Sequence, residues 1–217
     1  NIQHGSNLVQ SLDAKDAAKV LEEIEPKLQK ILVKYLGPDK ASDILSQMSI
    51  DEVVDLMKSL PREEAKVFLS HLRGAKMKNV EKLLLYPDDT AGGLMTLDFM
   101  KVEPEMTVKQ VMEDIKKHSA KHRSVLYIYV VDDDDKFKGV VSLRSLIVAD
   151  SGKKMSELTH EDDFHKNSTL DVDDDVDEIM EVMTKYDLFT AAVLDDNGKL
   201  LGIVSIDDVM RHLVPNA

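Results

Sequence analysis

The chain lacks cysteine and tryptophan, and only 5% of its residues are aromatic. The absence of cysteine excludes disulfide frameworks, thiolate metal sites and cysteine nucleophiles, and it fits a reducing compartment. No apolar run approaches the roughly 20 residues that a membrane-spanning helix needs. The start of the chain shows no charged segment followed by an apolar one, so no signal peptide is expected. Glycine-rich phosphate loops and nucleophile elbows are also missing, which argues against an enzyme.

What is present is the composition of a soluble globular protein: 217 residues, of which 43% are hydrophobic and 32% charged. The net charge of −13 is unevenly spread. Residues 1–90 carry 15 acidic and 13 basic side chains, whereas residues 91–217 carry 26 and 15. The second part therefore has a net charge of −11 (15 − 26) and repels nucleic acid phosphates, so no nucleic acid partner is expected. Such a surface attracts cations, or it serves solubility alone.

Two segments near the C-terminal end repeat the same pattern: VVDDDDKFKGVVSLRSL at 130–146 and VLDDNGKLLGIVSIDDV at 193–209. Gly139 corresponds to Gly202 and Ser142 to Ser205, at an offset of 63 residues (202 − 139). A unit of this length is too long for a solenoid repeat and suits two copies of a small α/β module. A paired module of this kind indicates ligand sensing more than catalysis.

Residues 8–87 predict short amphipathic helices, because apolar side chains recur at three- and four-residue steps. Ser49 and Glu52 have the spacing of a capping box at the start of one of these helices. Many short helices with tight connections favour a small superhelix over a long bundle. Gly92 and Gly93 then break the helical pattern and mark a junction.

Beyond the junction, helix and strand signals alternate. Thr107 and Gln110 form a second capping-box signal, and residues 125–131 predict a buried strand. The two copies each predict strand, turn, strand and helix, and the second turn contains the hairpin-forming pair Asn197 and Gly198. The predicted fold class is α plus α/β: a helical superhelix followed by two βαββα repeats.

The repeat, with GIVSIDDV at 202–209 as its clearest copy, resembles the CBS module, whose fingerprint is Gly, two apolar residues, Ser or Thr, two residues and Asp. The helical front joined by YPDDTAGGLMT at 86–96 resembles the cytosolic part of MgtE-type magnesium channels. This resemblance covers nearly the whole chain, and the junction makes it much more specific than the CBS motif alone. It implies an N domain at 1–90 and CBS domains at 91–155 and 156–217.

The resemblance further implies a homodimer on the cytoplasmic side of the plasma membrane. In that family the helical domain and the CBS pair bind Mg²⁺ and hold the pore shut when the ion is plentiful. The transmembrane pore domain would follow residue 217, so this chain is expected to be a soluble sensor fragment.

Five aspartates occupy positions that bind metal in the family: Asp88, Asp89, Asp187, Asp207 and Asp208. Mg²⁺ prefers oxygen ligands and keeps several waters, so one or two carboxylates per ion are enough for a weak sensor site. A structural role is the alternative. Asp207 suits a helix N-terminus and Asp88 a junction turn.

Adenine nucleotide is the second expected ligand. In nucleotide-binding CBS modules the fingerprint Asp holds ribose hydroxyls and the Ser or Thr lies near phosphate, and the second copy keeps this pair as Ser205 and Asp208. The resemblance places ATP near Tyr127 and Arg144 of the first copy. That copy has Ser145 where the Asp would stand, which weakens the expected ribose contact.

Other polar clusters carry weaker signals. The acidic run at 132–135 is expected to be a solvated turn. Residues 171–178 fail the EF-hand pattern, because Val176 replaces the glycine at position six, and a helix N-terminus lined with anions is expected instead. His118 and His122 are spaced to share a helical face, but no metalloprotease motif follows, so a zinc site is not expected.

The predicted mechanism is electrostatic. CBS aspartates face acidic side chains of the helical domain, among which Asp51, Glu52, Glu63 and Glu64 are candidates, and bound Mg²⁺ draws the domains into a closed state. The alternatives are an adenine-nucleotide sensor, a regulatory fragment of a CBS-containing enzyme, and a purely structural scaffold.

Overall fold

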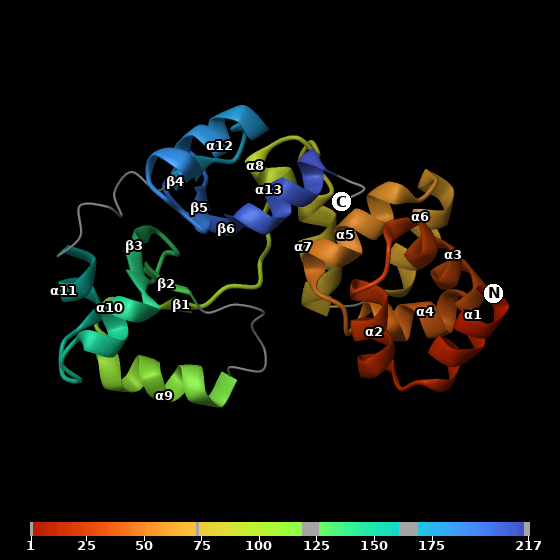
Figure 1. Ribbon diagram of the computed structural model, residues 1–217, viewed down its shortest axis with the longest axis horizontal. Coiled ribbons are helices and arrows are strands. Elements are labelled where there is room, and N and C mark those ends of the chain that lie inside the picture. Colours follow the sequence, from red (N-terminus) through yellow and green to blue (C-terminus); the bar gives the residue numbers. More distant parts are fainter. Residues whose placement is uncertain (1, 73, 119–125, 161–168, 215–217) are drawn as a thin grey trace. The chain divides into compact units, whose positions relative to one another are not determined.

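The computed structural model describes residues 2–72, 74–118, 126–160 and 169–214. The chain divides into two compact units, and the boundary falls between Tyr86 and Pro87. The first unit is helical and the second contains both sequence repeats (Figure 1). Within the described residues, no helix is both long enough and apolar enough to span a membrane.

The described part of the first unit is built of short helices in two layers. They are α1 (Ile2–Ser11), α2 (Ala14–Glu22), α3 (Pro26–Leu36), α4 (Pro38–Leu45), α5 (Ile50–Ser59), α6 (Arg62–His71) and α7 (Gly74–Leu83). Each odd-numbered helix packs on the next odd-numbered one, and α2, α4 and α6 pack in the same way. This arrangement confirms the predicted superhelix.

The superhelix has a period of 24 residues. Helices α2, α4 and α6 begin 24 residues apart (38 − 14 and 62 − 38), and so do α3, α5 and α7 (50 − 26 and 74 − 50). The buried alanines Ala17, Ala41 and Ala65 follow the same interval, one on each even-numbered helix. Small side chains at these positions let neighbouring helices approach closely.

The capping box predicted at Ser49 is wrong. Ser49 does precede α5, but its hydroxyl accepts no hydrogen bond from that helix. Its backbone N–H donates instead to Glu22 Oε1 of α2, at 2.6 Å. A carboxylate from another helix therefore occupies the donor that Glu52 was expected to satisfy.

The second unit holds two three-stranded sheets of identical topology. The strands are β1 (Lys101–Val102), β2 (Tyr127–Val131), β3 (Phe137–Ser142), β4 (Thr169–Asp171), β5 (Thr190–Leu194) and β6 (Leu200–Ser205). In each sheet the first strand pairs in parallel with the second, and the second pairs antiparallel with the third. The register is also repeated, since Val130 faces Gly139 and Val193 faces Gly202.

Helices complete the predicted βαββα pattern. They are α9 (Val108–His118) and α10 (Leu143–Val148) in the first repeat, and α12 (Val176–Lys185) and α13 (Ile206–Leu213) in the second. The capping box of Thr107 and Gln110 is confirmed by reciprocal bonds of 2.8 and 3.4 Å. Strands β1 and β4 and helix α11 (Met155–His160) were not predicted, because two to six residues are too few to show a periodicity.

The junction glycines do not break a helix. Gly92 and Gly93 lie inside a short helix, α8 (Ala91–Leu94), which Thr90 caps by accepting from Gly93 N. A Cβ on Gly93 would lie 1.8 Å from the Pro87 carbonyl oxygen. The glycine therefore serves a close backbone approach and not flexibility.

The two repeats are joined by side chains and by their hairpin turns. Tyr129 is 2% exposed, and its hydroxyl shares a 2.7 Å hydrogen bond with Thr190 Oγ1 of the other repeat. Phe137 N donates to Gly198 O at 2.9 Å, and Leu200 N donates to Asp135 O at 3.0 Å. The pair is therefore one folded body with a shared core.

Candidate functional site

All five aspartates predicted to bind metal belong to the second unit. Asp88 and Asp89 are exposed in the turn before α8, and Asp207 is exposed in the first turn of α13. Within the described residues, the carboxylates of Asp89, Asp187 and Asp207 make no hydrogen bond or ion pair. These three carboxylates keep their lone pairs available to a cation.

Asp187 has an unfavourable position for an aspartate. It follows α12 with φ of 50°, and Asp187 N and Leu188 N close the helix by donating to Thr184 O and Met183 O. This is a Schellman motif, in which the left-handed residue is usually glycine. The helix dipole also disfavours a negative charge at a helix C-terminus. Backbone and dipole both oppose an aspartate here, which suggests that its carboxylate has a role of its own.

Asp208 is held by its own helix. Ser205 caps α13, and its hydroxyl and backbone N–H both donate to Asp208 Oδ2. Oδ1 of the same carboxylate accepts from Arg211, and the side chain is only 16% exposed. Sequence reasoning missed Arg211, although its spacing of three residues from Asp208 on one helix could have revealed it.

The residues present fit Mg²⁺ in chemistry, since carboxylate oxygens are its preferred ligands. Across the described ranges, however, no three His, Asp or Glu side chains are grouped so that they could hold one ion. Asp88, Asp89, Asp187 and Asp207 thus offer single carboxylates or a neighbouring pair. Waters and ligands from elsewhere would have to complete the coordination of any ion.

The residues expected near a nucleotide lie on equivalent parts of the two repeats. Tyr127 begins β2, where partial burial raises the pKa of its hydroxyl, and Arg144 is exposed on α10. Ser205 caps α13 in the second repeat, as Ser142 caps α10 in the first. Ser142 Oγ bonds Ser145 Oγ at 2.8 Å, so two hydroxyls replace the Ser205–Asp208 pair.

The acidic run at 171–178 forms a helix N-terminus, as expected. Asp175 caps α12 in a capping box with Glu178. Asp174 lies just before this cap, and partial burial raises the pKa of its carboxyl. In the run at 132–135, Asp132 Oδ1 accepts from Asp134 N and Lys136 N, which confirms the predicted turn.

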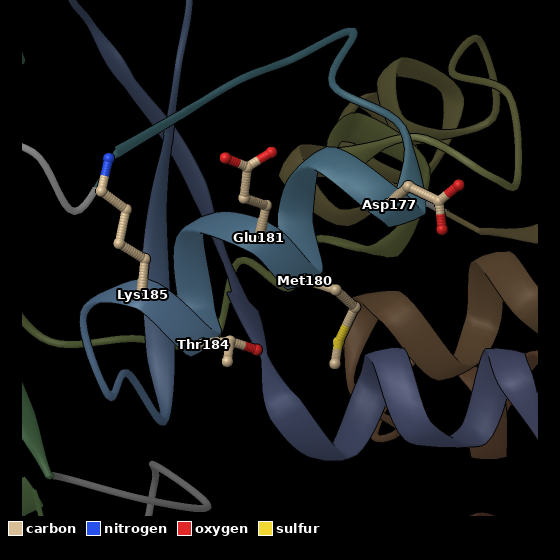
Figure 2. A pocket seen from close by; sticks show the side chains of 5 residues that line it. All are labelled: Asp177, Met180, Glu181, Thr184 and Lys185. Carbon is tan, nitrogen blue, oxygen red and sulfur yellow. The ribbon is translucent and has the colours of Figure 1, made fainter.

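A shallow hollow lies along α12. It is lined by Asp177, Met180, Glu181, Thr184 and Lys185. Figure 2 shows Met180 and Thr184 on the side of α12 toward α13, with Glu181 and Lys185 pointing away from it. None of the predicted site residues lines this hollow. His122 lies outside the described residues.

The candidate carboxylates of the helical unit have different surroundings. Glu63 pairs with Lys66 at 2.9 Å, and Glu64 pairs with Lys34 at 2.6 Å. Asp51 lies in the first turn of α5, where the ammonium of Lys76 is one of its neighbours. Burial lowers the pKa of Lys76 to about 8, and its Nζ donates to Ser46 O at 3.0 Å and also to Met48 O. Sequence reasoning missed Lys76, because no local pattern marks a lysine that caps another helix.

Comparison with known proteins gives matches along almost the entire chain. The model of the MgtE intracellular N domain matches residues 1–89, and the CBS domain model matches residues 91–152 and 162–215. The magnesium transporter MgtE of Thermus thermophilus is 34% identical over 204 residues, covering 93% of this chain and 44% of the relative. The MgtE of Bacillus subtilis is 26% identical and covers 99% of this chain and 47% of the relative. The chain thus spans about half the length of these relatives.

A solved structure agrees with the sequence matches. The crystal structure of the cytosolic domain of the Mg²⁺ channel MgtE in complex with ATP has a TM-score of 0.85 and 32% sequence identity. It covers 98% of this chain and 85% of that one. From the helical superhelix, the CBS pair and these matches, the chain belongs to the MgtE family, of which it comprises the intracellular N domain and the CBS domains.

Proposed function

We propose that this chain is the Mg²⁺-sensing regulatory region of a magnesium transporter, in which Mg²⁺ bridges carboxylates and favours a closed state. The observation that carries the proposal is Asp187, whose exposed carboxylate is kept at a left-handed helix C-terminus that favours glycine. A divalent ion beside it would offset both the charge and the unfavourable dipole.

The charge distribution supports the same function. Residues 91–217 carry 26 acidic and 15 basic side chains, so a divalent cation lowers the repulsion within this unit. Ligation by one or two carboxylates with retained waters gives a weak site, which suits an ion present at millimolar concentration. The ion shifts the equilibrium only through its higher affinity for the closed form.

The assignment of domains and setting belongs to this proposal. We assign residues 1–90 to the N domain, 91–155 to the first CBS domain and 156–217 to the second. The chain spans about half of its transporter relatives, so a membrane pore domain would lie outside it, and the chain would act on the cytoplasmic side of the membrane. The relatives named as transporters give no reason to expect catalysis.

A homodimer is part of the proposal and is supported by exposed apolar side chains at equivalent positions of the repeats. Leu126 and Phe189 are 63 residues apart (189 − 126), and so are Ile147 and Met210 (210 − 147). All four are at least 49% exposed. A surface with this internal symmetry suits pairing with a second copy. Sedimentation of an Ile147→Asp, Met210→Asp double variant should show a monomer, and an unchanged dimer would exclude this surface.

Adenine nucleotide is a second candidate ligand, favoured by the ATP complex of the related structure. Tyr127 and Arg144 would contact it from the first repeat, and Ser205 would serve the equivalent place in the second. Ser145 provides no carboxylate for a ribose, and Asp208 is occupied by Ser205 and Arg211. Calorimetry with ATP and AMP, each with and without Mg²⁺, separates a nucleotide sensor from a pure cation sensor.

The main proposal is tested by Mg²⁺ calorimetry on the whole chain. Asp187→Asn and Asp207→Asn should each weaken Mg²⁺ binding by about tenfold, as expected for one lost carboxylate ligand. Asp196→Asn is the matched control, since it removes the same charge from an exposed hairpin turn. Equal losses in all three variants would indicate a general charge effect and contradict a specific site.

A further inference from the structure

We propose that residues 87–96, hereafter the strap, are a folded part of the second repeat, and that the helical unit moves about the bond between Tyr86 and Pro87. The strap comes before the first repeat in the sequence. It nevertheless lies against the sheet and helices of the second repeat, where α8 is adjacent to α12 and α13 (Figure 1). The glycine-containing segment is therefore not the joint that its sequence indicates.

Backbone hydrogen bonds hold the strap at both of its ends. Ala91 N donates to Asp174 O and Gly92 N to Val172 O, each at 2.8 Å. Thr96 N donates to Ile203 O at 2.8 Å, and Ile203 N donates back to Thr96 O at 3.1 Å. The second pair adds a short antiparallel segment to the open edge of β6.

Packing between these hydrogen bonds is close. Met95 is 2% exposed, and a Cβ on Gly202 would lie 2.8 Å from Met95 Sδ and 2.9 Å from Thr96 O. In the first repeat the equivalent Gly139 faces Thr159 of α11, and Thr159 is itself 63 residues after Thr96 (159 − 96). Each repeat is thus completed by the segment that precedes the other one.

The change of unit occurs within one residue. Tyr86 O accepts from Lys58 Nζ of α5 at 3.4 Å, inside the helical unit. Pro87 O accepts from Thr90 N at 3.3 Å and from Thr90 Oγ1 at 3.0 Å, inside the strap. The proline ring fixes its own φ and restricts the residue before it, so few torsions remain for movement. The junction therefore permits a restricted swing and not a free rotation.

A consequence follows for ion binding, and this step rests on the proposed function. Asp88 and Asp89 lie beyond the hinge, so they move together with Asp187 and Asp207. Any ligand that reports domain closure must then come from the helical unit or from a second copy. Neutralising Asp88 and Asp89 would weaken binding without altering the hinge.

The absence of native cysteine makes the hinge measurable. Lys66→Cys and Asp196→Cys place one spin label on an exposed site of each unit. Double electron–electron resonance on this pair, diluted with unlabelled chain and measured with a magnesium chelator, gives the width of the inter-unit distance distribution. Hydrogen exchange at residues 88–97 reports the strap in the same samples.

Gly93→Ala removes the room for Pro87 O and should release the strap. We expect exchange at Ala91, Gly92 and Thr96 to rise by about tenfold and the distance distribution to widen by about twofold. Gly152→Ala is the control, because nothing lies within 4 Å of its added Cβ, and it should change neither. Pro87→Gly should widen the distribution while the strap stays protected, which keeps the test valid if Gly93→Ala does not fold.

Unprotected strap amides in the wild type would overturn the proposal, as would a released strap with an unchanged distance distribution. Neither measurement uses Mg²⁺. Adding the ion afterwards narrows the distribution only if the proposed function is also correct, so the two failures are distinguishable.

Discussion

The two CBS repeats share one backbone but differ in the side chains that could hold a ligand. In both hairpin turns an aspartate, Asp132 or Asp195, accepts from two backbone N–H groups at 2.9 to 3.0 Å. At the equivalent helix starts the first repeat has Ser145 and the second has Asp208. The duplicated parts are those that local backbone geometry requires. The acidic groups expected to bind a cation are concentrated in the second repeat and its strap.

The shared core between the repeats is also asymmetric. The first repeat contributes the rings of Tyr129 and Phe137, with Phe99 packed edge-on against Tyr129 at a centroid distance of 5.5 Å. The second contributes Ala192 at the position equivalent to Tyr129. The first repeat therefore supplies most of the buried ring surface, and the second supplies the small residues that accommodate it.

The largest effects are expected at the equivalent glycines of the two repeats. Gly139→Ala should destabilise the second unit by about 3 kcal/mol, because its φ of 146° disfavours a side chain and its Cβ would lie 2.9 Å from Thr159 Cβ. Gly202→Ala should cost about 2 kcal/mol and release the strap. Urea unfolding measures both values. A loss below about 0.5 kcal/mol in either variant would contradict the close packing described for that repeat.

A smaller effect is expected at the hydrogen bond that joins the repeats. Tyr129→Phe should lower the free energy of unfolding by about 1 to 2 kcal/mol, because it leaves Thr190 Oγ1 without its buried partner. Tyr127→Phe is the control on the same strand, since this residue is less buried. If both variants lose the same stability, the Tyr129–Thr190 bond has no special role in joining the repeats.

The non-glycine residues with positive φ allow a direct comparison of function and strain. Asp187→Gly should stabilise the chain by about 1 kcal/mol and weaken the Mg²⁺ response. Asp135→Gly should bring a smaller gain, because it relieves a φ of 62° but loses the 2.5 Å bond to Lys101, and it should leave the Mg²⁺ response intact. Thermal unfolding with and without the ion measures both effects. Destabilisation by Asp187→Gly would show that the aspartate is structural.

The smallest effect concerns Asp174, whose equivalent before the first-repeat helix is Met106 (174 − 106 and 175 − 107 are both 68). Partial burial raises the pKa of the Asp174 carboxyl. A raised pKa means that the stabilising contribution is present in acid, below the ordinary value of 3.8, and is lost as the pH rises through the folded pKa. Asp174→Asn should therefore slightly raise the Tm at pH 7 and lose this advantage near pH 3. A larger advantage in acid would reverse the assignment.

The sequence predicted those features that a few neighbouring residues determine. The hairpin at Asn197, the capping box at Thr107 and the offset between the repeats all depend on local chemistry. The capping box at Ser49 was wrong because its donor is taken by Glu22, 27 residues earlier in the chain. The glycine pair was misread because the strap bonds Ile203, which no local pattern can indicate. The candidate aspartates were named from the family resemblance, and the unfavourable conformation of Asp187 is visible only in three dimensions.

The central claim is that Mg²⁺ converts a loosely connected chain into a compact one by bridging carboxylates. Small-angle X-ray scattering across a Mg²⁺ titration, at constant ionic strength, tests it most directly. The account predicts that the radius of gyration falls at millimolar Mg²⁺ in the wild type and stays constant in an Asp187→Asn, Asp207→Asn variant. A wild-type radius that does not change, or an equal decrease in the variant, would contradict it.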